Sequence, residues 1–139
     1  MAFKHGRLFE VTVATKALSL FCDTADIDIN IDNAETSVAT NSYKTYLAGL
    51  AGGTLTLSGS WDPTVTTGPA SVLLAQIALN QAGTVTAVIF YPAGNNAGQG
   101  TSHTFNALLS NYKESSKVSD KVAFSCSLLV TGVDTVAQL

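Results

Sequence analysis

The chain has 139 residues, a formal net charge of −3 and only 12% charged residues. This length fits one domain, spanning 1–139, whose core is large enough to fold without disulfides or a bound metal. The weakly acidic balance and the scattered Lys and Arg residues exclude a basic nucleic-acid-binding domain. No apolar run approaches the roughly 20 residues of a membrane-spanning helix, so no membrane partner is expected.

The low charge implies that uncharged side chains supply most of the polar surface. Thr and Ser are frequent along the chain, and Thr is a β-branched residue that suits strands. Because burying charge is costly, a surface with little charge also favours contact with neighbouring copies. The composition therefore indicates a β-rich domain with a tendency to assemble.

The first third of the chain predicts three strands. Residues 7–14 alternate between apolar and polar side chains, and residues 17–22 are compatible with a short second strand. Residues 26–32 alternate more strictly, with three isoleucines on one face. The other face of that strand carries the polar residues Asp26, Asp28, Asn30 and Asp32.

Residues 33–53 lose this period and end in a stretch rich in Gly and Ala. They are predicted to form a long loop or extended arm, which in a compact domain is usually functional or disordered. Tyr43 and Tyr46 lie in this segment, where aromatic side chains serve either as interface anchors or in local packing. Residues 54–61 resume alternation and predict a strand that ends at Trp61, a candidate for core or sheet-edge packing.

The next segment predicts the helix of the domain, over about 69–81. Gly68 suits the N-cap, and Pro69 suits the first helical position because its missing N–H is not needed there. Gly83 is a natural stop. A helix of this length is marginal alone, so it must pack on a sheet.

The last third predicts three more strands and the remaining connections. Residues 84–91 are apolar on both faces, which is typical of a central strand. Further strands are predicted over 103–112 and 121–131, with a Gly/Asn loop over 92–102 and a turn over 113–119. The fold class is therefore mainly β, a sandwich or barrel of about seven strands with one flanking helix. Residues 1–6 are expected to form an N-terminal arm and residues 133–139 a C-terminal tail.

Motifs that would carry chemistry are incomplete in this sequence. The acidic run 23–32 fails as an EF-hand loop, which needs Gly at position 6 and Glu at position 12. A loop that starts at Asp26 has Ile31 and Ser37 there, and one that starts at Asp28 has Asn33 and Ala39. The glycine-rich stretch 94–100 has no lysine for a phosphate-binding loop and leads into a strand. Only two histidines are present, and no hydrolase motif accompanies them. No catalytic residue, metal ligand or cofactor is predicted, and the chain is not expected to be an enzyme.

The two cysteines, Cys22 and Cys126, could pair, but nothing requires it. The N-terminus lacks the apolar segment of a secretion signal. Two reduced and partly buried thiols are therefore the expected state.

The order of four segments resembles the tail tube (major tail) proteins of long-tailed bacteriophages. The first is the acidic strand 26–32, followed by Thr36-Ser37. The second is Tyr46-Leu47-Ala48-Gly49-Leu50, followed by a strand that ends in Trp61-Asp62. Tyr91-Pro92-Ala93-Gly94 and the closing strand 122–132 complete the order.

This resemblance implies a β-sandwich with one flanking helix that forms homohexameric rings. The rings stack into a hollow tube around a tape-measure protein, contact other tail proteins and later let DNA pass without sequence-specific binding. The implied location is the virion tail, and the host cytoplasm during assembly. The long loop would reach the next ring, with Asn41, Tyr43, Tyr46 and Leu50 as the expected interface residues.

The net charge suggests a hypothesis about the lumen of such a tube. Each copy in a ring contributes a net charge of −3, and an acidic or neutral lumen repels phosphate. The candidates for its lining are Asp26, Asp28 and Asp32, or alternatively Ser125 and Ser127. The sequence does not choose between the two sets.

Two other classes of function remain open. One is a different virion part: a tail terminator, a head–tail connector or a capsid decoration protein. The other is a small β-sandwich module that binds carbohydrate or a cell surface.

Overall fold

The structure is a computed structural model that describes residues 9–39, 42–94 and 100–138. These residues form seven strands and one helix, which confirms the expected mainly β class with a flanking helix. In chain order the elements are β1 (Glu10–Val13), β2 (Lys16–Ala17), β3 (Cys22–Glu35), β4 (Tyr46–Ser60), α1 (Pro69–Gln81), β5 (Thr86–Tyr91), β6 (Thr101–Ser115) and β7 (Ala123–Gln138).

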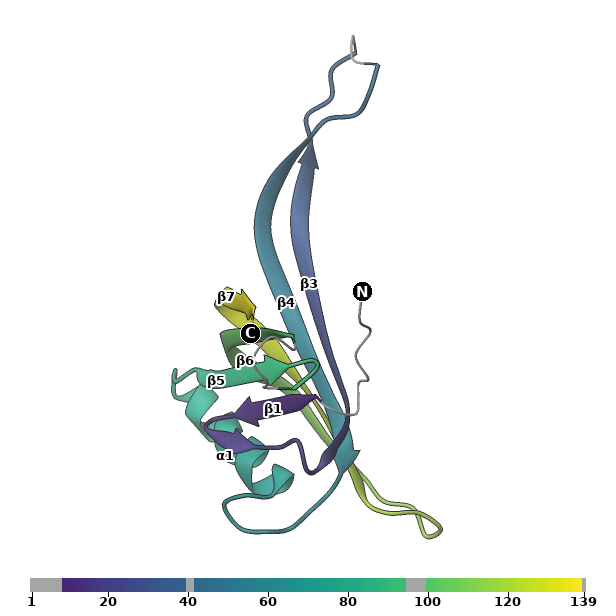
Figure 1. Ribbon diagram of the computed structural model, residues 1–139, viewed down its shortest axis with the longest axis vertical. Helices are drawn as coiled ribbons and strands as arrows, with labels where there is room; N and C mark the ends of the chain where they lie inside the picture. Colours follow the sequence, from purple (N-terminus) through teal and green to yellow (C-terminus); the bar gives the residue numbers. More distant parts are fainter. Residues whose placement is uncertain (1–8, 40–41, 95–99, 139) are drawn as a thin grey trace.

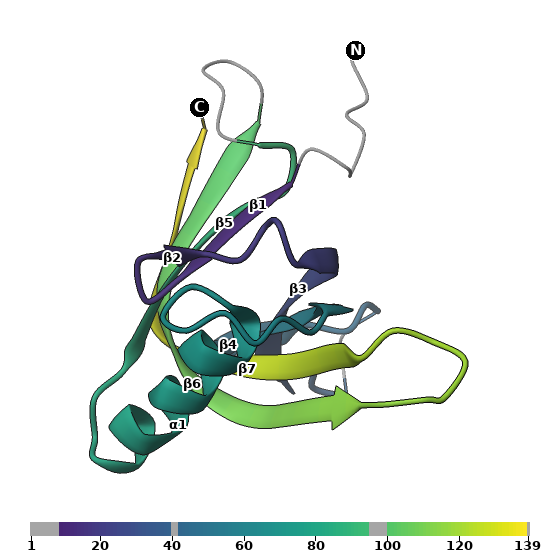
Figure 2. The same ribbon diagram turned by 90° about the horizontal axis from the view of Figure 1, so that it is seen from below.

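All seven strands belong to one antiparallel sheet with the order β2-β1-β5-β6-β7-β4-β3. The long strands β6 and β7 pass through both halves of this sheet. The first half of β6 pairs with β5, whereas the first half of β7 pairs with β4. The sheet bends between these halves and folds over on itself, so that two layers face each other (Figure 2).

The bend coincides with an irregularity in β7. Gly132 has a φ of +84°, a conformation that glycine adopts without a steric cost. Next to it, Asn106 pairs with Thr131 but Thr104 pairs with Thr135, so β7 carries extra residues at this point. A β-bulge of this kind bends a strand and increases its twist, which accounts for the turn from one layer into the other.

The core lies between the two layers. Ile27, Leu55, Leu128 and Leu109 form one row across four strands, because directly paired residues share a face. The fully buried side chains come from both layers and from the helix: Val11, Val13, Leu18, Leu55, Leu57, Leu73, Val88, Ala107 and Leu128.

Helix α1 has the bounds that its flanking residues predict. Gly68 is extended at the N-cap and Pro69 starts the first turn, while Gly83 has a φ of +95° just after the C-cap. Asn80 fixes the last turn to the sheet: its Nδ2 donates to the Thr84 carbonyl at 2.8 Å, and its Oδ1 accepts the Leu109 N–H at 2.8 Å. The helix therefore covers one side of the folded sheet (Figure 2).

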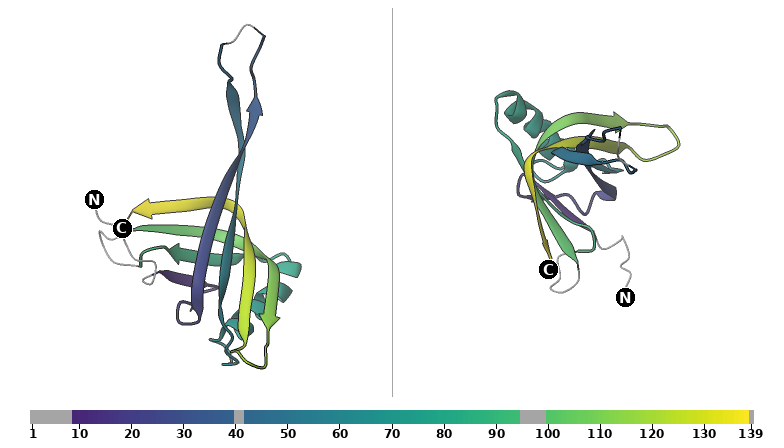
Figure 3. Two further views of the ribbon diagram at one scale, coloured as in Figure 1. Left: turned by 90° about the vertical axis from the view of Figure 1, so that its right-hand side faces the viewer. Right: turned by 90° about the horizontal axis from the view of Figure 1, so that it is seen from above.

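The predicted long loop over 33–53 is wrong. Most of it belongs to β3 and β4, which form one long hairpin that projects from the body, and only residues 36–45 connect them (Figures 1 and 3). The projecting part of the hairpin has no core on either side of its strands. Residues 46–52 therefore lack the apolar alternation that marks a half-buried strand.

Smaller differences concern the chain ends and the second strand. Residues 133–138 continue β7 and do not form a tail, because they pair with the first half of β6 beyond the bulge. Strand β2 is limited to Lys16–Ala17. The expected arm over 1–6 and the terminal Leu139 lie outside the described residues.

Candidate functional site

One surface of the sheet, here called the polar face, spans β3, β4, β7 and β6 on the side away from the core. Its central row consists of Asp26, Thr56, Ser127 and Asn111, which are paired in register across the four strands. The neighbouring rows contain Asp28 and Thr54 with Leu129 and Leu108, and Thr24 with Ser58, Ser125 and Lys113. The result is a broad, mostly polar surface that is interrupted by the exposed Leu129 and Leu108.

This register joins the two alternative sets of lumen candidates. Asp26, Asp28, Ser125 and Ser127 all lie on the polar face, so the aspartates and the serines are parts of one surface. Asp32 is exposed at the register shift between Ile31 and Asn33, and the pairing does not assign it to this face. Whether the polar face lines a lumen stays a prediction.

The β3–β4 hairpin provides a second candidate surface. The pairing of β4 with β7 ends at Thr54 and Leu129, so the hairpin beyond this point has no neighbouring strand within the described residues. It nevertheless exposes large apolar side chains, with Leu50 85% and Leu47 65% exposed. Apolar side chains gathered on an isolated ribbon mark an interaction surface.

The expected interface residues fall on this hairpin. Tyr46 and Leu50 belong to β4, and Tyr43 lies in the connection, where it is 87% exposed. Asn41 lies outside the described residues. Hydrogen bonds close the connection at its base, where the Thr36 N–H donates to the Thr45 carbonyl at 2.7 Å. The hairpin therefore presents two of its aromatic side chains on a hydrogen-bonded scaffold.

The four-stranded layer of β3, β4, β7 and β6 has an open strand edge on each side, within the described residues. Strand β3 has β4 on one side and no partner on the other. Strand β6 loses β5 after Ala107; Asn80 of α1 accepts the Leu109 N–H, and beyond Leu109 this side of β6 has no strand partner. Free strand edges present unpaired N–H and C=O groups that favour pairing with another chain.

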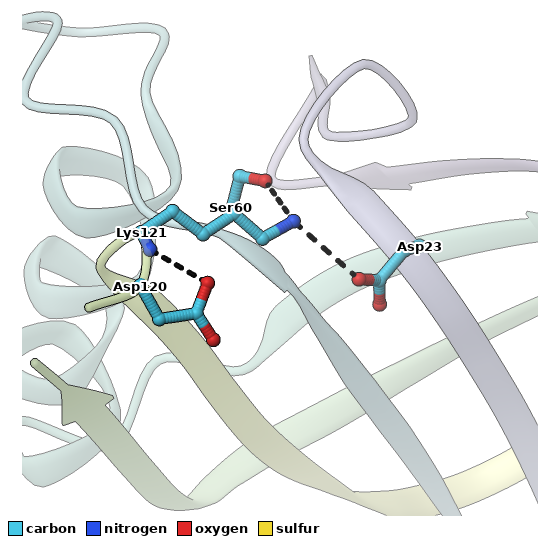
Figure 4. Close-up of polar contacts among 4 residues, drawn as sticks. All are labelled: Asp23, Ser60, Asp120 and Lys121. Atoms are coloured by element: carbon cyan, nitrogen blue, oxygen red, sulfur yellow. Dashed lines mark hydrogen bonds and ion pairs between the residues drawn. The ribbon is translucent and has the colours of Figure 1, made fainter. Parts of the chain in front are cut away.

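Polar contacts order the end of the molecule opposite the hairpin tip (Figures 1 and 4). The Lys121 Nζ donates to the Ser60 Oγ at 2.9 Å and lies 4.0 Å from Asp23 Oδ2. The Lys121 N–H donates to Asp120 Oδ1 at 2.8 Å. These contacts hold the start of β7 against β3 and β4.

A second polar cluster lies nearby, around Glu114. Its Oε1 accepts the Trp61 Nε1–H at 3.0 Å and the Tyr112 hydroxyl at 2.9 Å. Partial burial, followed by this contact with Glu114, raises the pKa of Tyr112. Trp61 is partly buried and packs against the core, which agrees with the packing role predicted for it.

A third polar feature was missed by the sequence reasoning. His103 Nδ1 lies 2.8 Å from Asp134 Oδ2, and the two side chains are only 15% and 12% exposed. The His103 ring also stacks on Phe90, with 6.2 Å between the ring centroids. Asp134 is the only charged residue of β7, and a single carboxylate in a strand assigned to a tail is the signal that could have identified it.

Little in the described residues indicates reactive chemistry. They contain no group of three or more His, Cys, Asp or Glu residues that could hold a metal ion. Both cysteines are free, and burial raises the pKa of the Cys22 and Cys126 thiols to about 12, which suppresses thiolate reactivity. Across 9–39, 42–94 and 100–138, no helix has the length and apolar character needed to cross a membrane.

The folded sheet, the flanking helix and the projecting hairpin define a fold that occurs in tubular virion and injection assemblies. The chain is similar to one in the virion of a native gene transfer agent particle, with 7% identity, a TM-score of 0.76, and coverage of 97% of this chain and 99% of that one. It is also similar to a chain of the SPP1 tail tube, with 14% identity and a TM-score of 0.71, and the match covers 99% of this chain and 80% of that one. A third similar chain comes from the anti-feeding prophage cap, a tube terminating cap. Its identity is 17% and its TM-score 0.74, and the match covers 100% of this chain and 93% of that one.

No family model matches the sequence, and no curated protein matches it. At these low identities the likeness concerns the fold. It confirms the tail-tube fold that the order of sequence segments predicts.

Proposed function

We propose that this protein is the structural subunit of a phage or phage-like tail tube. Copies form homohexameric rings, and the rings stack around a tape-measure protein into a conduit for DNA. The observation that carries this proposal is the projecting β3–β4 hairpin, which exposes apolar side chains beside a four-stranded layer with an open edge on each side. Such a subunit is incomplete as a monomer.

Ring closure follows from the free edges. The open side of β3 in one copy and the open second half of β6 in the next can pair and continue the four-stranded layer around an axis. The core side of this layer is covered by the second layer and α1. The polar face, with Asp26, Asp28, Ser125 and Ser127, is therefore the side that lines the lumen. Its carboxylates disfavour the binding of DNA phosphates.

Stacking follows from the hairpin. It extends along the long axis of the molecule (Figure 1), and heterologous contacts repeated along an axis build an open tube. Tyr43, Tyr46 and Leu50, together with Asn41, contact the next ring. The proposal assigns no enzymatic role to the chain and places it in the virion tail, and in the host cytoplasm during assembly.

Electron microscopy of the purified protein tests this proposal. Tubes or stacked rings with six-fold symmetry are expected. The Leu50→Lys variant places a charge in the hairpin interface and should yield shorter tubes or single rings. Val65→Lys is the matched control, because Val65 is 77% exposed outside the hairpin. A protein that stays monomeric at high concentration, alone and with its tail partners, would contradict the assignment.

A tube terminator is the second candidate. It is favoured by the similarity to a chain of a tube terminating cap. A terminator occurs as one ring at the end of each tube, whereas a tube subunit is present along its whole length. Labelling of virions with an antibody against this chain distinguishes the two roles.

A further inference from the structure

The bulge in β7 opens a small pocket outside the surfaces described above. Ile29 and residues 51–53 of the hairpin form one wall, and Val130, Gly132 and Asp134 of β7 form the other. The pocket lies where β7 diverges from β4, just beyond the last paired residues, Thr54 and Leu129. Its lining is apolar except for one carboxyl group.

That carboxyl group has unused hydrogen-bonding capacity. Asp134 Oδ2 contacts His103, but Asp134 Oδ1 is buried and has no hydrogen-bond partner among the described residues. A buried carboxylate oxygen without a donor is unfavourable. The χ2 torsion of Asp is broad, so a rotation can present one oxygen to the pocket. The pocket therefore suits a hydrogen-bond donor carried beside an apolar side chain.

The position of the pocket limits what can reach it. The pocket lies on the hairpin side of the last β4–β7 pair, because β7 leaves β4 beyond Leu129. The turn between β6 and β7 projects from the opposite end (Figure 1). In a head-to-tail stack, the turn of one copy therefore faces the pocket of the copy below it.

The chemistry of this turn matches the pocket. Val118 is fully exposed at 111% of its reference area and follows Lys117, which is also exposed. The hairpin tip carries a comparable pair, Tyr43 and Lys44. The tip, however, lies at the same end of the molecule as the pocket. In a head-to-tail stack it therefore points toward the copy above and away from that copy's pocket.

We propose that the pocket is a docking site for the β6–β7 turn of a second copy. Val118 packs against the apolar walls, and the Lys117 ammonium donates to Asp134. This inference rests on the proposed function, because it requires copies stacked in one direction. It adds a contact between the bodies of successive rings to the contact made by the hairpin.

Disulfide trapping in assembled tubes tests the contact. Ala51 is exposed and lines the pocket, and a disulfide requires Cα atoms about 4.4–6.8 Å apart. The double variant Ala51→Cys/Val118→Cys should form a ladder of linked chains after mild oxidation. Each single variant, and the pairs Ala51→Cys/Val65→Cys and Ala51→Cys/Tyr43→Cys, should not. Tubes that form without a 51–118 ladder, or that give a 51–43 ladder, overturn the inference and leave the tube assignment intact.

A charge variant provides a second readout that does not depend on cysteine geometry. Lys117→Ala should raise the protein concentration needed for tube growth by about fivefold or more, since it leaves the buried Asp134 Oδ1 without a hydrogen-bond donor in the interface. Lys16→Ala is the control, because Lys16 is exposed on β2, and it should leave that concentration unchanged. Equal behaviour of the two variants contradicts the inference. Failure of the unmodified protein to form tubes under any condition refutes both the inference and the proposed function.

Discussion

Strand β4 contains two glycines whose replacement by alanine should have opposite effects on stability. A Cβ atom at Gly59 would collide with the Phe21 carbonyl oxygen and lie 2.7 Å from the Cys22 Cα. A Cβ atom at Gly52 would meet nothing within 4 Å. Both sites lie in β4 and receive the same substitution. What differs between them is the space available to the added methyl group.

The expected size follows from these contacts. Overpacking costs about 1–3 kcal/mol. The shift that relieves it also endangers the 2.8 Å hydrogen bond from the Ser60 N–H to the Phe21 carbonyl, which contributes about 1 kcal/mol. Gly59→Ala should therefore lower the free energy of unfolding by about 2–4 kcal/mol. Gly52→Ala should raise it by about 0.4–1 kcal/mol, through the lower entropy of the unfolded chain.

Urea unfolding of the dissociated subunit measures both changes, with the fluorescence of the single Trp61 as the signal. Thermal unfolding gives a second measure, at roughly 3–4 °C per kcal/mol for a domain of this size. If Gly59→Ala is as stable as Gly52→Ala, then β3 and β4 are not packed around Gly59 as described, and the reasoning is refuted.

Three further predictions concern other parts of the fold. Asn80→Ala should cost about 2–3 kcal/mol in urea unfolding, because it removes the hydrogen bonds of Asn80 to the Leu109 N–H, the Thr84 carbonyl and the Thr86 hydroxyl. Asn80→Asp keeps the acceptor for Leu109 but sets a carboxylate oxygen against the Thr84 carbonyl oxygen, so it should also be destabilising. Burial raises the pKa of Cys22 and Cys126 from 9.0 to about 12. The unfolded chain then loses these protons first, and stability should fall from about pH 9 upward; replacing both thiols by alanine should flatten that fall. Ser127→Lys should make tubes retain DNA at low salt, as measured by filter binding, whereas Val65→Lys, which lies outside the polar face, should not.

The sequence predicted the elements that have strong local signals. Helix α1 was predicted at its observed bounds because Gly68, Pro69 and Gly83 specify its ends. The strand around Ile27 was predicted because isoleucines alternate with polar residues, and Ile27 packs partly buried against the core. In both cases the information lies within a few residues of the element itself.

Elements that depend on distant parts of the chain were not predicted. Residues 46–53 form a strand by pairing with β3, although their Gly and Ala residues give no alternation. Residues 133–138 continue β7 after a bulge at Gly132 that moves the pattern out of phase.

The candidate surfaces were not predictable from local sequence patterns either. Asp26 and Ser127 lie on one face because of the register between neighbouring strands, and no short stretch of sequence specifies that register. The pocket at the β7 bulge likewise combines Ile29 with Asp134, which lie far apart in the sequence.

The direction of the strands also determines how the subunit responds to mechanical load. Strands β3 and β4 run along the long axis of the molecule and are paired over most of their length (Figure 3). A pull along that axis loads their hydrogen bonds in shear, so that many must break together. Strands β6 and β7 each continue from this layer into the layer that contains β5. Their covalent backbone therefore transmits the same force into that second layer. A wall built from such subunits resists stretching along its length more strongly than the peeling of one strand from its edge.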